Sequence, residues 1–99
     1  MITIRLIFFA ILQLEFGETH NIVIKEPIEL RQIFDFFQSK SGKKGSSFFL
    51  ENEELKKGFT ILIDGRNILA LEGLDTSLSH DCEVSIFPLI AGGFFKLGL

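Results

Sequence analysis

Apolar side chains recur at every second position in the first segment of the chain. Residues 2–8 (ITIRLIF) carry an apolar residue at each even position, a period of two that is typical of a β-strand with one buried face. Gly17 interrupts this pattern, and residues 20–25 (HNIVIK) form a second apolar run. The two runs predict a pair of strands that form a hairpin.

The apolar period changes to that of a helix after Pro27, which permits a helix start. Glu29 suits the positive end of the helix dipole. The next apolar residues are spaced i, i+3, i+4 and i+7 and predict one helix that packs a single stripe onto the sheet. These residues are Leu30, Ile33, Phe34 and Phe37.

A polar connection is expected to follow this helix. Residues 39–47 (SKSGKKGSS) end the helix and begin a connection that reaches to about Gly58, interrupted by the apolar residues 48–50. The stretch GKKGSS superficially resembles a phosphate-binding loop, but it lacks the required spacing and follows a helix instead of a strand. We therefore interpret it as a solvated loop.

The last part of the chain predicts three further strands. Residues 59–64 (FTILID) form the first, Asp64 and Gly65 a tight turn, and residues 66–69 (RNIL) a short return strand. A loop with a helical turn is expected up to Asp81, and residues 83–88 (EVSIFP) form the final strand. This order predicts an α+β fold, with one main helix on one face of a mixed sheet of four to five strands.

Composition and charge narrow the classes of function. The 99 residues are enough for one domain with one core, and 46% of them are hydrophobic. The net charge of −3 argues against nucleic acid as a partner. The single cysteine, Cys82, cannot form an internal disulfide. The first uninterrupted apolar run, residues 6–12, is far shorter than the ~20 residues of a membrane-spanning helix. We expect a cytoplasmic protein without membrane contact.

Candidate residues for intrinsic catalysis or metal binding are few. His80 and Cys82 are too few for a closed zinc site, and no Ser/His/Asp set stands out in a chain with two histidines. We therefore expect no intrinsic catalytic site and no cofactor or metal bound by the chain itself.

Residues 61–93 (ILIDGRNILALEGLDTSLSHDCEVSIFPLIAGG) carry three motifs that together are highly specific. They are GRNI at 65–68, LDTSL at 74–78 and EVSIFP at 83–88, the last leading to Ala91-Gly92-Gly93. This stretch closely resembles the C-terminal third of the MoaD/ThiS sulfur-carrier family, with the MoaD group, the small subunits of molybdopterin synthase, as the nearest match. The N-terminal part is similar in a looser way.

The resemblance implies a ubiquitin-like β-grasp domain over residues 1–93, followed by a C-terminal extension, residues 94–99. It also implies a non-catalytic sulfur donor, whose terminal glycine is adenylated and converted to a thiocarboxylate for molybdopterin (molybdenum cofactor) biosynthesis. The implied partners are a MoeB/ThiF-like adenylating enzyme, which uses ATP and Mg²⁺, and a MoaE-like large subunit of molybdopterin synthase. A protease that removes the extension is a further expected partner.

On this resemblance Gly93 carries the reactive carboxylate, and Gly92 keeps the tail thin enough for a narrow channel. We expect Phe87, Pro88 and Ala91 to contact partner proteins. Phe87 is the candidate anchor, because only one side of the last strand can face the helix. Two other functions stay open: a ubiquitin-like modifier conjugated to lysines, and a non-carrier interaction module that retains its tail.

Three departures from the family pattern concern the last strand and its exit. Asp81-Cys82 stands where a Gly-Asp turn is common, and Leu89 replaces the second residue of a common Pro-Pro pair. The third departure concerns the chemistry directly, because residues 94–99 (FFKLGL) follow Gly93 and a peptide bond therefore occupies its carboxylate.

Overall fold

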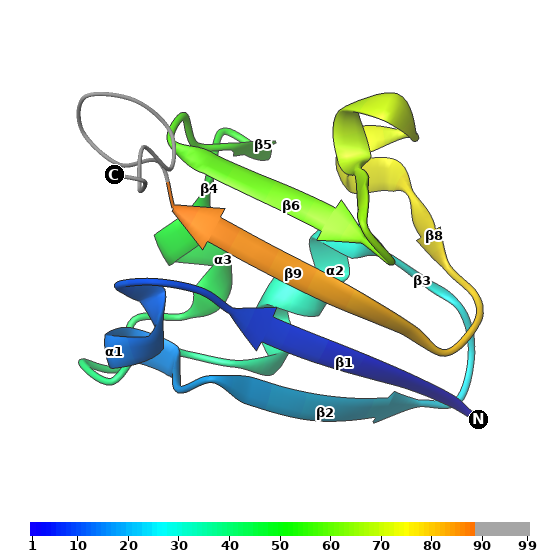
Figure 1. Ribbon diagram of the computed structural model, residues 1–99, viewed down its shortest axis with the longest axis horizontal. Coiled ribbons are helices and arrows are strands. Elements are labelled where there is room, and N and C mark those ends of the chain that lie inside the picture. The colour runs from blue at the N-terminus through cyan, green and yellow to red at the C-terminus, as the bar shows by residue number, and fades with distance from the viewer. Residues whose placement is uncertain (89–99) are drawn as a thin grey trace.

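The computed structural model describes residues 1–88, and a mixed β-sheet forms its centre (Figure 1). The sheet has the strand order β2-β1-β9-β6-β7, with β1 parallel to β9 and the other neighbours antiparallel. Its strands are β1 (Ile2–Phe8), β2 (Thr19–Ile24), β6 (Phe59–Ile63), β7 (Arg66–Asn67) and β9 (Cys82–Pro88).

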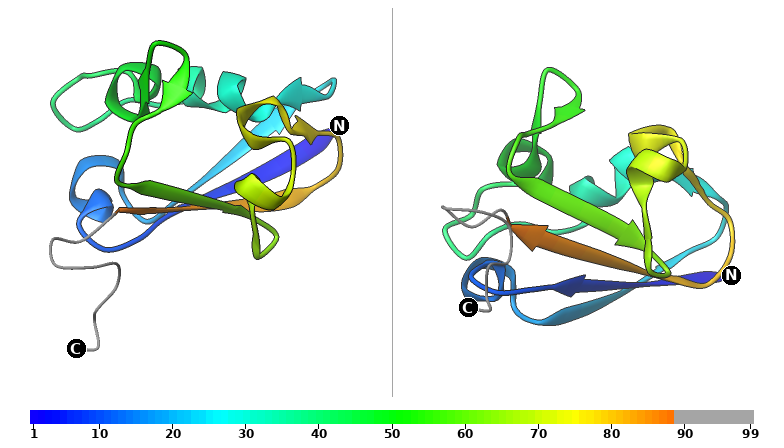
Figure 2. Two further views of the ribbon diagram at one scale, coloured as in Figure 1. Left: turned by 90° about the horizontal axis from the view of Figure 1, so that it is seen from above. Right: turned by 45° about the horizontal axis from the view of Figure 1, so that its top comes forward.

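The rest of the described chain contains short helices and two short strand pairs. Strand β3 (Ile28–Glu29) pairs with β8 (Ser77–Leu78), and β4 (Leu50–Glu51) pairs with β5 (Glu54–Leu55). Figure 2 shows that α2 and α3 lie on the same side of the sheet; we call the side that these two helices do not cover the open side. The helical elements are α1 (Leu12–Phe16), α2 (Leu30–Ile33), α3 (Gly45–Phe49) and the 3₁₀ turns η1 (Phe34–Phe36), η2 (Ile68–Ala70) and η3 (Gly73–Asp75).

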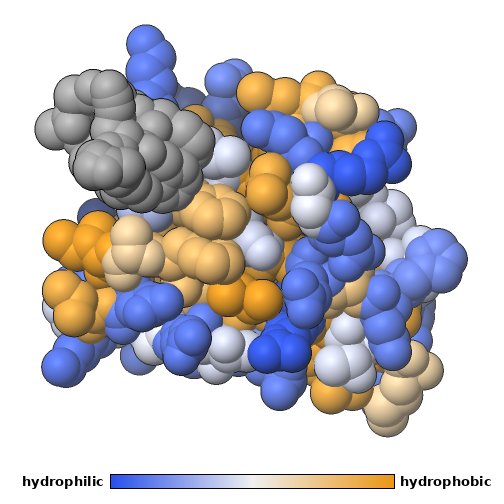
Figure 3. All heavy atoms as spheres, viewed as in Figure 1, coloured by the Kyte–Doolittle hydropathy of each residue, from blue (hydrophilic) through white to orange (hydrophobic). Residues whose placement is uncertain are grey.

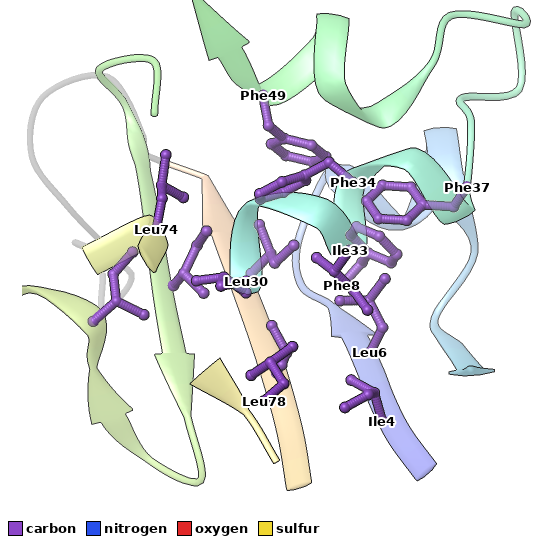
Figure 4. Packing of buried hydrophobic residues seen from close by; sticks show 14 of the residues in the cluster. Ile4, Leu6, Phe8, Leu30, Ile33, Phe34, Phe37, Phe49, Leu74 and Leu78 are labelled. Carbon is purple, nitrogen blue, oxygen red and sulfur yellow. The ribbon is translucent and has the colours of Figure 1, made fainter. Parts of the chain in front are cut away.

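The core lies between the sheet and these helices. The even residues of β1 point into it, as the alternation predicts, and Ile61, Val84 and Ile86 add buried side chains from β6 and β9. Phe34 and Phe49 cover them from the helical side, 5.5 Å apart between ring centroids (Figure 4). Phenylalanine rings therefore fill part of the core between the sheet and the short helices.

The predicted helix is shorter than its apolar period suggested. All four residues of the stripe are buried, but α2 ends at Ile33, and η1 continues it for one tighter turn. Phe37 is extended, with φ −149° and ψ 164°. Its carbonyl accepts a hydrogen bond from Gly45 N–H at 2.9 Å, so the backbone pairs with the start of α3 instead of continuing the helix.

The polar connection contains structure that composition did not predict. Residues 45–49, expected to lie in a loop, form α3, and a two-strand ribbon, β4–β5, follows it. A Cβ on Gly45 would lie 2.5 Å from the carbonyl oxygen of Phe34 and 2.6 Å from the ring of Phe37. Glycine at this position therefore lets α3 approach η1 closely enough to bury Phe49.

The predicted tight turn at Asp64-Gly65 is confirmed. Both residues have positive φ, 49° and 84°, which is the signature of a type I′ turn, and Ile63 pairs with Arg66 across it. The return strand β7 is only two residues long, and the final strand begins one residue earlier than expected, at Cys82. The predicted α+β class, with helices against one face of a mixed sheet, is confirmed.

Candidate functional site

Strand β9 is the element that leads to the Gly-Gly motif. It lies in the middle of the sheet, between β1 and β6, so hydrogen bonds on both sides hold its direction. The described residues end at Pro88, where this strand ends. The predicted site residues Ala91, Gly92 and Gly93, and the extension 94–99, lie outside the described residues.

The two faces of β9 have different surroundings. Val84 and Ile86 are fully buried against the helices, whereas Ser85 and Phe87 are half-buried on the open side of the sheet. The expectation that only one set of side chains faces the helices is therefore confirmed. Pro88 has the inward parity of Val84, is buried and pairs with Phe59 of β6.

Phe87 is stacked on a second aromatic ring that the sequence analysis did not single out. The rings of Phe9 and Phe87 are 4.2 Å apart between centroids, with an angle of 14° between their planes. Phe9 N–H donates to the carbonyl of Ile86 at 3.1 Å, which extends the β1–β9 ladder beyond the last residue of β1. The odd position of Phe9 in the alternation of the first strand could have indicated that it lies on the side opposite the core, although not that it stacks on Phe87.

These rings belong to an apolar area on the open side of the sheet, which we call the open-face patch: Ile7, Phe9, Leu62 and Phe87. Ile7 and Leu62 both pair with Ser85, from the two strands that flank β9. Figure 3, which views this side, shows hydrophobic surface where β1 and β9 end. The patch therefore lies beside the last residues of β9, the strand that precedes the Gly-Gly motif.

The opposite end of this side is charged. Arg5 of β1 and Glu83 of β9 form an exposed ion pair of 4.0 Å between Nη1 and Oε2. Such a pair contributes little to stability. The open side is therefore apolar at the end of β9, where the open-face patch lies, and charged at the start of β9.

Residues of the LDTSL motif hold neighbouring elements together through hydrogen bonds and burial. Arg31 of α2 donates to Asp75 Oδ1 from Nη2 at 2.7 Å and from Nε at 3.2 Å, and from Nη1 to the Glu53 carbonyl at 2.8 Å. The hydrogen bond to Asp75 is the main reason that the pKa of Arg31 is raised. Thr76 Oγ1 donates to the Gly73 carbonyl at 2.7 Å, and Leu78 is buried.

The departure at Asp81-Cys82 has a structural counterpart at the start of the sheet. The Asp81 carboxylate accepts a hydrogen bond from Thr3 N–H at 2.8 Å, which ties the loop before β9 to β1. On the other side, Asp64 Oδ1 accepts from Glu83 N–H at 2.9 Å. Two carboxylates thus fix where β9 begins.

The charges of these two carboxylates also act on the Cys82 thiol. Burial, followed by the charges of Asp64 and Asp81, raises the pKa of Cys82 to about 11. Because a thiolate is the reactive form of cysteine, Cys82 is poorly suited to carry or transfer sulfur at neutral pH. His80 contacts Ser79 Oγ through Nδ1 at 3.1 Å.

Residues 1–88 contain neither a metal-binding cluster nor a membrane-spanning helix. No group of three or more His, Cys, Asp or Glu side chains there is placed to hold a metal ion. Within the same residues, no helix has both the length and the apolar character to cross a membrane.

Comparisons with known proteins place this arrangement in a family. The ThiS family model matches residues 6–93. A protein from Archaeoglobus fulgidus, named as a proposed sulfur carrier, is 32% identical over 68 residues, which cover 69% of this chain and 77% of that protein.

Two solved structures show the same ubiquitin-like β-grasp fold. The small archaeal modifier protein 1 from Methanosarcina acetivorans is 25% identical, with a TM-score of 0.67 over 94% of this chain and 98% of that one. A Pyrococcus furiosus protein, named as a proposed subunit 1 of a molybdopterin converting factor, is 18% identical, with a TM-score of 0.64 over 91% and 100% of the two chains. The chain therefore belongs to the ThiS family of sulfur carriers and ubiquitin-like small modifiers.

Proposed function

We propose that this protein is a MoaD-like sulfur carrier for molybdopterin biosynthesis, and that Gly93 is its working residue. In this function the chain supplies the reacting atom, a thiocarboxylate sulfur, and a partner enzyme supplies the active site. The chain is then the non-catalytic subunit of a molybdopterin synthase.

One observation carries the proposal: the match to the ThiS family runs through the whole domain and ends at Gly93. The last two residues of that match are a Gly-Gly pair, and six residues follow it. The similarity to the Archaeoglobus fulgidus protein, named as a proposed sulfur carrier, supports the same function. The likeness to the Pyrococcus furiosus protein supports the fold and motivates the molybdopterin assignment.

The chemistry requires a free carboxylate on Gly93. A carboxylate is a poor electrophile, so its oxygen first attacks the α-phosphate of ATP, and pyrophosphate leaves. A sulfide-level nucleophile then attacks the acyl adenylate and displaces AMP, which leaves a glycyl thiocarboxylate. ATP and Mg²⁺ belong to a MoeB/ThiF-like adenylating enzyme in this proposal.

Cleavage after Gly93 is part of the proposal, because the carboxylate of Gly93 is bound in the peptide bond to Phe94. Until a protease hydrolyses that bond, neither adenylation nor sulfur loading can occur. Ala91, Gly92 and Gly93 then form a tail without bulky side chains, which suits a closely walled channel.

The open-face patch is the proposed docking surface for the adenylating enzyme and for a MoaE-like large subunit. Its Phe87 ring lies beside the exit of β9, so a partner that holds the tail also meets this ring. Buried aromatic anchors dominate many interfaces. Pro88 is buried. A partner contact of Pro88, and one of Ala91, stay predictions.

The second candidate is a ubiquitin-like modifier, in which a lysine amine attacks the Gly93 acyl group. It displaces AMP from the adenylate, or a thiol from a later thioester, and forms an amide bond. The similarity to a small archaeal modifier protein favours it as the alternative. A non-carrier interaction module, with the tail retained, is the third candidate, and it needs no chemistry at Gly93.

ATP–pyrophosphate exchange with the cognate adenylating enzyme tests the proposal. A chain ending at Gly93 should support exchange. The full chain should not, because its Gly93 has no free carboxylate. The chain ending at Gly93 with Gly92→Val should not either, because the added side chain blocks the channel. Equal exchange with and without Gly92→Val would contradict the channel argument. Incubating the loaded carrier with a MoaE-like subunit and a pterin precursor, and separately with lysine-bearing proteins, then distinguishes sulfur transfer from conjugation.

A further inference from the structure

Strand β2 forms one edge of the sheet, and no further strand lies beyond it among residues 1–88 (Figure 1). Edge strands expose unpaired backbone groups, and proteins usually protect them with charges, proline or a bulge. Thr19–Ile24 (THNIVI) contains neither a charged residue nor proline. Its pairing with β1 is continuous from Ile2↔Ile24 to Ile7↔Thr19, without a bulge.

The pairing with β1 shows which backbone groups of β2 point outward. Phe8 N–H donates to the Glu18 carbonyl at 2.9 Å, so Phe8 and Glu18 form a hydrogen-bonded pair. Such pairs alternate along an antiparallel ladder, and they therefore recur at His20, Ile22 and Ile24. The N–H and C=O groups of the odd residues, Thr19, Asn21 and Val23, consequently point away from the sheet.

The side chains of these three odd residues are exposed as well, and Val23 keeps 56% of its surface in contact with solvent. None of the three takes part in a side-chain hydrogen bond or ion pair within residues 1–88. Within residues 1–88, the edge therefore has no partner for its outward backbone groups or its outward side chains.

We propose that β2 binds β2 of a second copy of this chain, in antiparallel orientation, about a two-fold axis at Asn21. Asn21 then faces Asn21 of the other copy, and Thr19 faces Val23 on either side. All three outward residues enter hydrogen-bonded pairs, which gives up to about six main-chain hydrogen bonds. The two sheets become one continuous sheet with both helical layers on the same side.

Charge selects this register among those that the symmetry allows. A two-fold axis normal to the sheet keeps each face continuous, so residues that face each other must both be odd-numbered or both be even-numbered.

A register centred on Ile22 would place Glu18 opposite Glu26, and facing like charges destabilise a sheet. A register centred on His20 would place Val23 opposite Gly17, outside the strand. The register centred on Asn21 sets Glu18 opposite Ile24 and Lys25 opposite Gly17, without a facing pair of like charges.

The second copy leaves the exit of β9 accessible. Strand β1 separates β2 from β9, and the open-face patch lies at β1, β9 and β6. The dimer is therefore compatible with every candidate function above and does not rest on any of them.

Sedimentation equilibrium of the full chain from micromolar to millimolar concentration tests the pairing. We expect the mass to rise toward twice the monomer mass. Asn21→Pro should weaken dimerisation at least tenfold, because it removes an outward donor without breaking a bond to β1, whereas the matched control Asn21→Ala keeps the N–H and should dimerise. Circular dichroism confirms that each variant is folded. Asn21→Lys, which places two lysines face to face, gives the same expectation if the proline variant fails to fold.

A charge pair tests the register itself. Thr19→Glu or Val23→Lys alone should weaken the dimer, whereas the double variant should restore it, because the new carboxylate of one copy then faces the new ammonium group of the other. A chain that stays monomeric up to about millimolar concentration, or a dimer insensitive to both Asn21→Pro and Asn21→Lys, would overturn the proposal. So would a double variant that is no tighter than the weaker single variant.

Discussion

At the scale of single residues, position along β9 decides the environment of each side chain. Strand parity alone predicted that Phe87 would lie on the side opposite Ile86, and the structure has it there. Parity could not predict the Phe9–Phe87 stack, because Phe9 follows the last residue of β1 and its place depends on the parallel register of two strands distant in sequence.

Phe87→Ala is expected to weaken binding to a partner enzyme by ~2 kcal/mol or more, as truncation of a buried interface aromatic does. The melting temperature should change little, because Phe87 is half-buried on the open side of the sheet and is not part of the core. Titration calorimetry with the adenylating enzyme and a thermal melt measure the two effects.

Ile86→Ala is the matched control, one residue away on the other face of the same strand. Ile86 is fully buried, so its truncation should cost about 2–5 kcal/mol of unfolding free energy. If Phe87→Ala destabilised the fold as much as Ile86→Ala and left partner affinity unchanged, Phe87 would be a core residue and not an anchor.

Cys82 is expected to react slowly with iodoacetamide in the folded protein. Its pKa of about 11 keeps the thiol protonated at neutral pH, and the rate should rise about tenfold per pH unit until the pH approaches that value. Mass spectrometry of the alkylated chain measures this rate, with the unfolded chain as the control. Labelling at pH 7 as fast in the folded as in the unfolded chain would show that the carboxylates and burial do not protect the thiol.

At the scale of elements, local patterns predicted the strands better than the helices. Alternation identified β1, and the Asp-Gly pair identified the β6–β7 turn, because both signals are contained in a few adjacent residues. Element α3 was not predicted, because its helix depends on tertiary contacts that a local polar sequence does not indicate. Gly45 packs against η1, and Phe49 lies in the core.

Gly45→Ala is expected to lower the free energy of unfolding by about 1–3 kcal/mol, the usual cost of overpacking. The added methyl group would meet the Phe34 carbonyl and the Phe37 ring, and α3 would have to move away. Chemical denaturation measures the loss. Ser47→Ala, at an exposed position of the same helix, should stay within about 0.5 kcal/mol of the parent, and an equal loss in both variants would refute the packing argument.

At the scale of the whole molecule, the fold could be inferred from the order of elements together with the family motifs. The sequence did not show the strand order, which places β9 between β1 and β6 and brings its end beside the open-face patch. Nor did it show that β2 is an unprotected edge. Both properties depend on which strands pair, and local apolar periods carry no information about pairing.

The intact mass of the protein from its own cells tests the central claim most directly. We expect a species that ends at Gly93, a fraction of which carries sulfur in place of one oxygen, and thus a processed carrier with a thiocarboxylate. If the only form found retains the residues after Gly93 while the cells are making molybdenum cofactor, this protein is not the active carrier, and the interaction-module function replaces the proposal.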